Sequence, residues 1–205
     1  MLEEKKCLVE NCENSVFHKN GGQKEYCGKH YQQIYKYGKI LERTKYDPNK
    51  IIDCDDYYEI CLYKHNPHAE EIARTKIDKE DLKKVKNYKW YINKKGYVVS
   101  TNKHLYIHRL ILGNPPNGYN IDHKFGKKLD NRKQNLRFAT KSQNGMNRKA
   151  KGYHWDKNEN KWHAEIMKNY KHINLGYFTD EQVAAKIAEE AKQKYFGEFA
   201  YKETN

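Results

Sequence analysis

The chain lacks the features of a membrane or secreted protein. It has no apolar run long enough to span a bilayer and no apolar segment of a secretory signal. Its five cysteines are an odd number, and an intracellular chain keeps them reduced. Hydrophobic residues are only 37% of the 205, so no single large core is expected. We therefore expect a soluble chain of small modules in the cytoplasm or nucleoid of a bacterial or virus-infected host, whose cysteines are ligands or core residues.

Positive charge is plentiful but unevenly placed. The net charge is +13, and residues 101–150 alone carry +9, from eleven Lys and Arg against two Asp. Residues 151–205 carry no net charge. The basic excess sits where a phosphate backbone would lie, and the 18 tyrosines interleaved with lysine suit a nucleic acid surface.

The first 45 residues contain two close pairs of metal-binding side chains, Cys7-x4-Cys12 and Cys27-x2-His30. Two such pairs separated by a loop can enclose a tetrahedral zinc ion, which would hold together a segment too polar to fold by burial alone. His18 is the competing ligand. The alternative is that these side chains are buried or incidental and hold no metal.

Residues 46–104 favour a β-rich scaffold. Residues 46–55 suggest a linker and a turn, and residues 57–63 suggest a strand. Asp78 is expected to cap a helix over residues 79–88, with Leu82 and Val85 on its inner face. Residues 90–99 indicate a hairpin.

The basic stretch contains an Asp-His pair at the end of an expected strand, Tyr119 to His123. A loop, a second strand over residues 136–139 and a helix capped by Thr140 follow, with Gln143 in the capping-box position. A carboxylate, an imidazole and the amide of Asn144 would converge. These are the groups needed to cut a phosphodiester with one divalent metal.

This stretch resembles HNH nucleases of the ββα-metal type, especially the phage and intron-associated homing endonucleases. The resemblance runs through His108-Arg109-Leu110-Ile111, Pro115-Pro116, Ile121-Asp122-His123, Leu129-Asp130-Asn131-Arg132, Asn135-Leu136-Arg137, Gln143-Asn144 and Asn147-Arg148. The third residue of the family name, usually His, is Asn144 here. It favours an oxygen-binding metal such as magnesium or manganese over zinc at this site.

The resemblance implies a role for each of these side chains. Asp122 and Asn144 would hold the catalytic ion, His123 would take a proton from water, and Asn135 would support it by bracing the loop. The phosphate contacts expected are Arg109, Arg132 and Arg137. For His108, core packing, phosphate contact and auxiliary catalysis all stay open.

Residues 151–205 suggest three short strands followed by a helix that ends at Gly197. Thr179 is the expected cap, with Val183, Ala184, Ile187, Ala188, Ala191 and Tyr195 on the inner stripe. The segment resembles the plant ethylene-response-factor DNA-binding domain at Lys161-Trp162-His163-Ala164-Glu165-Ile166, Leu175-Gly176-Tyr177-Phe178 and Ala184-Ala185. In that family the sheet enters the major groove. Here the segment contains no arginine, the commonest guanine reader.

In this module, lysine side chains and aromatic rings would therefore have to make the contacts with DNA. The expected residues are Lys157, Lys161, Lys168, Lys171, Trp155, Trp162 and His163. The alternative is a structural cap on the nuclease. Because the module has no candidate catalytic set, its removal is expected to weaken DNA binding and leave cleavage in place.

Together these patterns predict a modular α+β protein. Its parts are a zinc-finger-like module (1–45), a β-rich scaffold (46–104), an HNH core (105–150) and an ethylene-response-factor-like domain (151–205). The predicted function is a metal-dependent homing-type endonuclease that acts on double-stranded DNA, with no membrane partner, as a monomer or alternatively a dimer. The competing functions are a non-catalytic, sequence-specific DNA-binding regulator and an RNA-binding accessory protein.

Overall fold

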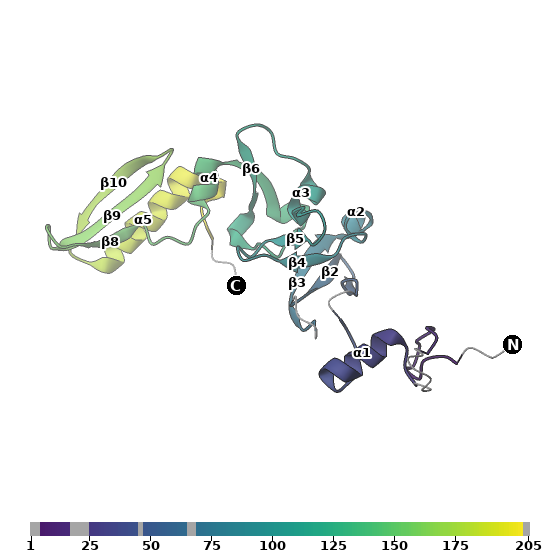
Figure 1. Cartoon of the computed structure of the whole chain (residues 1–205). Helices are drawn as coiled ribbons and strands as arrows, with labels where there is room; N and C mark the ends of the chain where they lie inside the picture. The colour runs from purple at the N-terminus through teal and green to yellow at the C-terminus, as the bar shows by residue number, and fades with distance from the viewer. Residues whose placement is uncertain (1–4, 17–24, 45–46, 65–68, 203–205) are drawn as a thin grey trace. The chain divides into compact units, whose positions relative to one another are not determined.

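The computed structural model describes residues 5–16, 25–44, 47–64 and 69–202. The chain divides into two compact units, residues 1–47 with 64–70 and residues 48–63 with 71–205, and each is described by itself (Figure 1). The described residues form four small sheets and five α-helices, so the chain is mixed α/β. None of the described helices has the length and apolar character needed to cross a membrane.

The first unit contains one described helix, α1 (Gly28–Tyr37), which begins directly after Cys27. It ends at Gly38, whose left-handed backbone (φ 69°) lets its N–H bond to the Ile34 carbonyl at 2.8 Å. His18, the competing zinc ligand, lies outside the described residues.

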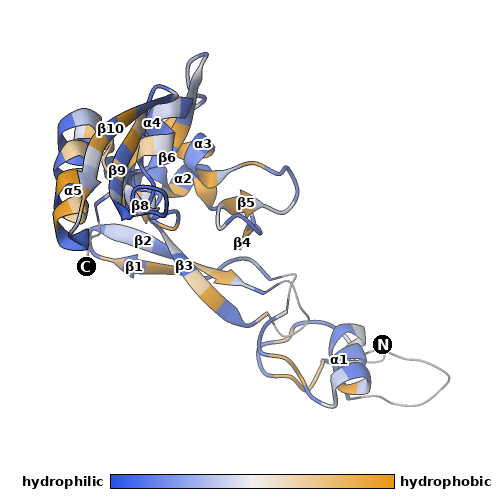
Figure 2. Cartoon of the chain, turned by 90° about the vertical axis from the view of Figure 1, so that its left-hand side faces the viewer, coloured by the Kyte–Doolittle hydropathy of each residue, from blue (hydrophilic) through white to orange (hydrophobic). Residues whose placement is uncertain are grey.

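The second unit begins with an antiparallel sheet of β1 (Ile51–Cys54), β2 (Tyr57–Tyr63) and β3 (Glu71–Asp78), in that order. Its strands mix apolar and polar residues (Figure 2). Residues 46–55 were expected to be a linker and a turn; the turn is present, but residues 51–54 form strand β1. Ile51 pairs with Ile60, and a two-residue Asp55–Asp56 turn closes a hairpin, with Asp55 at φ 55°.

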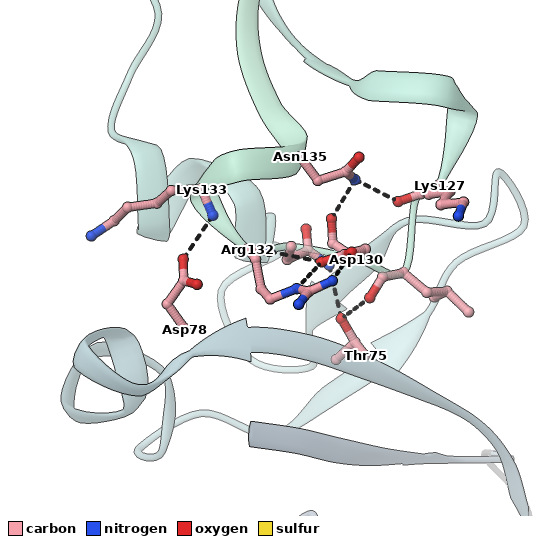
Figure 3. Close-up of polar contacts among 9 residues, drawn as sticks. Thr75, Asp78, Lys127, Asp130, Arg132, Lys133 and Asn135 are labelled. Atoms are coloured by element: carbon pink, nitrogen blue, oxygen red, sulfur yellow. Dashed lines mark hydrogen bonds and ion pairs between the residues drawn. The ribbon is translucent and has the colours of Figure 1, made fainter. Parts of the chain in front are cut away.

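The helix expected over residues 79–88 is much shorter, a 3-10 turn η1 (Lys79–Asp81) continued by α2 (Leu82–Val85). Asp78 makes no cap bond, because its Oδ2 accepts a 2.7 Å hydrogen bond from the Lys133 backbone N–H (Figure 3). The inner face is as expected, with Val85 fully buried. The predicted hairpin is also confirmed, as β4 (Trp90–Ile92) and β5 (Val98–Ser100).

One hydrophobic core joins the scaffold to the stretch that carries the Asp-His pair. It is built from Ile60, Leu62, Ile77, Val85, Trp90, Val98, Ile107, Ile111, Ile121 and Leu136. Each such side chain contributes about 1.5–3 kcal/mol when buried. Residues 46–104 and 105–150 therefore fold around a common interior.

The Asp-His pair lies on an antiparallel hairpin followed by a short helix. α3 (Ile107–Leu112) precedes β6 (Tyr119–His123), and two 3-10 turns, η2 (Lys124–Gly126) and η3 (Lys133–Asn135), lie in the loop before β7 (Leu136–Thr140). α4 (Lys141–Met146) begins with the predicted capping box. Thr140 Oγ1 accepts from the Gln143 N–H at 3.2 Å, and Gln143 Oε1 accepts from the Thr140 N–H at 2.8 Å.

The predicted sheet and helix of residues 151–205 are present. β8 (Tyr153–Asp156), β9 (Lys161–Lys168) and β10 (Lys171–Phe178) form a sheet in the order β10-β9-β8. α5 (Glu181–Phe196) lies along this sheet (Figure 1). The buried alanines Ala164, Ala184 and Ala188 let the two layers approach closely.

Two details of α5 were predicted wrongly. Its cap is Asp180, whose Oδ1 accepts from the Gln182 N–H at 2.7 Å, and not Thr179. Val183 is 44% exposed and does not belong to the inner stripe. A 3-10 turn, η4 (Gly197–Phe199), follows the helix.

Candidate functional site

Asp122 and His123 end strand β6 and are both buried, at 5% and 4% exposure. They line a cavity of about 350 Å³ together with Tyr97, Gly126, Lys128, Lys141, Asn144, Gly145, Asn147 and Arg148. Asn144 reaches this cavity from α4. The structure thus brings together the carboxylate, imidazole and amide that the sequence singles out, with basic side chains around them.

The His123 ring is held by Asn131, a fully buried residue of the loop. His123 Nε2 lies 3.0 Å from Asn131 Oδ1, while Asn131 Nδ2 donates to Thr75 Oγ1 at 2.8 Å. Because the amide nitrogen already donates, we assign the ring proton to Nε2, which leaves the lone pair on Nδ1. Burial lowers the pKa of His123, although Asn131 works in the opposite direction. The ring is therefore a neutral base at neutral pH.

The Asp122 carboxylate is held from two sides. Arg137 lies directly across the hairpin, and its Nε and Nη2 are each 2.9 Å from Asp122 Oδ2. Asn147 Nδ2 is 3.0 and 3.1 Å from the two carboxylate oxygens and also donates to the His123 carbonyl at 2.7 Å. Asp122 Oδ2 is thus the more heavily bonded oxygen, and Oδ1 accepts only from Asn147 among the described residues.

The oxygen atoms around Asp122 fit a hard divalent cation. Asn147 Oδ1 is buried and has no hydrogen-bond partner among the residues that the structure describes. An ion held by Asp122 and Asn144 would lie in the cavity that Asn147 also lines. An all-oxygen set of this kind suits magnesium or manganese.

Asn135 holds the loop between the two strands (Figure 3). Its Nδ2 donates to the carbonyls of Lys127 and Asp130, at 3.1 and 2.7 Å. This is the geometry of a brace, the role expected from the sequence. Asn135 thus acts on the loop that carries Asn131.

The three arginines expected at phosphates lie in different settings. Arg132 forks onto Asp130 at 2.9 and 2.6 Å, and its guanidinium carbon lies 5.0 Å from the Tyr57 ring centre. Arg137 is turned inward onto Asp122. Arg109 is exposed. Phosphate contact by each of them stays a prediction.

His108 packs inside an aromatic cluster next to the Asp-His pair. Its ring centre is 5.2 Å from those of His123 and Tyr106 and 5.7 Å from that of Tyr97. Its Nδ1 is buried without a hydrogen-bond partner among the described residues. Burial, followed by the charges of His123 and Arg109, lowers the pKa of His108 to about 3. Of the roles left open by the sequence, neutral packing against His123 matches this setting.

The first unit brings Cys7, Cys12, Cys27 and His30 together. The Cys12 and Cys27 sulfurs are 3.9 Å apart, and His30 Nδ1 lies 3.3 Å from Cys7 Sγ and 3.5 Å from Cys27 Sγ. Tetrahedral zinc with ordinary bond lengths would require separations of ~3.8 Å between sulfurs and ~3.6 Å between sulfur and nitrogen. Burial raises the pKa of Cys7, but the Cys27 N–H and His30 outweigh it and bring it to about 6. The cluster is therefore suited to a metal ion.

The residues expected to contact DNA in the terminal sheet do not share one face. Trp162 packs against the buried alanines on the α5 side, and Lys168 lies over the Tyr195 ring of α5, 5.9 Å from its centre. His163 alternates with Trp162 and lies on the opposite face, stacked on Tyr177 at 4.4 Å. Lys157 and Lys171 are exposed, and so are Lys161 and Trp155.

Three residues that build the site were not singled out from the sequence. Thr75 and Asn131 support His123, and Asn147 supports Asp122. Asn131 and Asn147 lie within the matched motifs, but nothing in their spacing shows which side chain they touch. Thr75 lies far away along the chain, on β3.

Comparison with known proteins agrees with this geometry. The family model described as HNH endonuclease matches residues 102–146. The chain is 36% identical over 126 residues to an uncharacterized HNH endonuclease of Acanthamoeba polyphaga mimivirus, covering 57% of this chain and 67% of the relative. No solved structure matches the chain. A buried Asp-His pair on a hairpin, a following helix and these matches lead to one conclusion: the chain belongs to the HNH endonuclease family.

Proposed function

We propose that this HNH family member is a metal-dependent DNA endonuclease of the free-standing homing type. The observation that carries the proposal is the orientation of His123. Its Nε2 is held by Asn131, so its Nδ1 is the ring atom left to accept a proton, next to the buried Asp122. The basic excess of residues 101–150 supports a polyanionic substrate.

His123 would act as the general base. Nδ1 takes the proton from a water molecule as that water attacks the scissile phosphorus, and the Asn131 contact keeps the ring oriented while its charge changes. Asp122 and Asn144 would hold one magnesium or manganese ion, which when bound supplies positive charge to the phosphate and the leaving oxygen. Lys128 and Arg148, which line the cavity, would contact the DNA backbone.

The other parts of the chain would bind and place the DNA. Cys7, Cys12, Cys27 and His30 would hold one structural zinc ion. The face of the terminal sheet that carries His163 and Lys161 would contact double-stranded DNA, and Trp162 would pack in the interior of the module. A monomer with one site would cut one strand, so nicking is the expected product.

The test is a single-turnover nicking assay on supercoiled plasmid DNA, with and without magnesium. His123→Ala should lower the rate by ~100- to 10,000-fold, the usual contribution of a positioned base, and leave DNA binding intact. His104→Asn is the matched control, because His104 is exposed and asparagine tolerates its left-handed backbone (φ 50°). Equal rates for wild type and His123→Ala would remove His123 from the mechanism. A wild type that binds DNA and never nicks it would favour the non-catalytic regulator.

A further inference from the structure

The segment that follows α5 returns to the nuclease core. Arg137 Nη1 donates to the Glu198 carbonyl at 2.5 Å, and its guanidinium carbon lies 4.1 Å from the centre of the Phe199 ring. Ala200 is 1% exposed. The Tyr201 ring lies 3.6 Å from where a Cβ on Gly126 would stand. Residues 197–201, which we call the return segment, are therefore packed against the hairpin loop and strand β7.

The same guanidinium holds the Asp122 carboxylate. One edge of Arg137 bonds Asp122 Oδ2, another bonds the Glu198 carbonyl, and a face lies on Phe199. The side chains of Arg137 and Asp122 are only 10% and 5% exposed. A planar fork of donors fixed at all these points has little freedom to rotate. Its position on Asp122 therefore depends on the return segment.

We propose that Arg137 is a positioning residue through which the return segment orients Asp122. By occupying Oδ2, Arg137 leaves Oδ1 as the carboxylate oxygen with capacity for a further ligand. This inference rests on the proposed function, in which Asp122 holds the catalytic ion. It also revises the expectation that residues 151–205 could be removed without affecting cleavage.

The effect of the return segment on Asp122 can be measured as a change in metal affinity. Groups that orient a ligating carboxylate typically change metal affinity or activity by ~10- to 100-fold when removed. Arg137→Gln should raise the manganese dissociation constant within that range. Phe199→Ala should act in the same direction but more weakly, by ~3- to 10-fold, because Arg137 keeps its bond to Asp122.

The experiment uses full-length, zinc-replete protein. Manganese binding without DNA is followed by the EPR signal of the free ion, and single-turnover nicking is followed at low and high manganese. Phe199→Ala is compared with Val183→Ala, which shortens an exposed apolar side chain on α5. We expect Phe199→Ala to weaken manganese binding, to slow nicking at low manganese and to recover at high manganese. Val183→Ala should match wild type in each measurement, and DNA affinity should change in neither variant.

The double variant decides whether the effect passes through Arg137. If it does, the double variant Arg137→Gln, Phe199→Ala should bind manganese as tightly as Arg137→Gln alone. Both changes interrupt the same contact between the return segment and Asp122, so their effects should not add. Additive losses, or an unchanged manganese affinity in Phe199→Ala, would overturn the inference. Should Arg137→Gln fail to fold, an unchanged manganese affinity in Phe199→Ala still overturns the inference. Asp122→Asn separates the proposals: wild-type manganese binding and nicking there would refute the proposed function itself.

Discussion

Acid sensitivity is the first consequence of placing His108 in the interior. The ring faces Tyr97, Tyr106 and His123, and its neighbour in sequence is Arg109. Its Nδ1 lacks a hydrogen-bond partner among the described residues, and the pKa of His108 is lowered by burial to about 3. A proton on this ring would therefore be buried without a partner, close to a second imidazole.

The sign of the pH effect follows from where the proton binds. In the unfolded chain His108 titrates at the ordinary value of 6.5, whereas in the folded chain it titrates at about 3. Between these values only the unfolded chain binds the proton, so the free energy of unfolding falls as the pH falls. Above pH 6.5 His108 is neutral in both the folded and the unfolded chain, so it causes no loss in the free energy of unfolding there. At pH 5 the loss amounts to about 2 kcal/mol from this residue.

The perturbation is His108→Leu, which removes the titrating group and keeps an apolar side chain of similar size. Urea unfolding is measured at pH 7.5 and pH 5 for both proteins by tryptophan fluorescence, with the buried Trp90 as a reporter. Wild type should lose about 2 kcal/mol more than His108→Leu between the two pH values. The same loss in both proteins would show that His108 can take up a proton within the fold, and the argument from burial would be wrong.

Two further predictions concern the metal cluster and the support of His123. Protein purified without added metal should contain about one zinc per chain, as a Cys3His site implies, and Cys27→Ser should lower it; zinc content near zero in wild type, or unchanged in the variant, would rule the site out. Asn131→Ala should slow single-turnover nicking by ~10- to 100-fold, because the His123 ring loses its hydrogen-bond partner, while DNA affinity by gel shift stays unchanged. A rate equal to wild type would mean that Asn131 supports only the loop.

The elements around the active site were predictable because local and long-range signals agree there. The strand expected over Tyr119–His123 and the Thr140–Gln143 capping box each depend on a few neighbouring residues, and both are confirmed. The cap expected at Asp78 was wrong because the Asp78 carboxylate instead accepts from Lys133, far along the chain. A local rule cannot show that a distant backbone group competes for the same carboxylate.

The partner of Asp122 can be derived from the sequence once the register of the hairpin is known. Two strands over residues 119–123 and 136–139 form a hairpin, and the observed register sets Ile121 opposite Phe138 and Asp122 opposite Arg137. An acid and a base facing each other on a buried hairpin favour an ion pair over a free phosphate contact. By contrast, no pattern in the sequence indicates that residues 197–201 return to the same arginine.

The functional unit is therefore larger than the stretch that carries the family motif. The HNH match covers residues 102–146, yet Thr75 lies before it, and Asn147 and Phe199 lie after it. Each of these residues contacts a side chain that in turn holds Asp122 or His123, or contacts the pair directly. A motif supplies the reacting groups, but their orientation depends on buried hydrogen bonds whose other ends lie elsewhere in the fold. For that reason, residues 102–146 alone would contain the Asp-His pair with Asn131 and Arg137, but without Thr75, Asn147 and Phe199, which contact Asn131, Asp122 and Arg137.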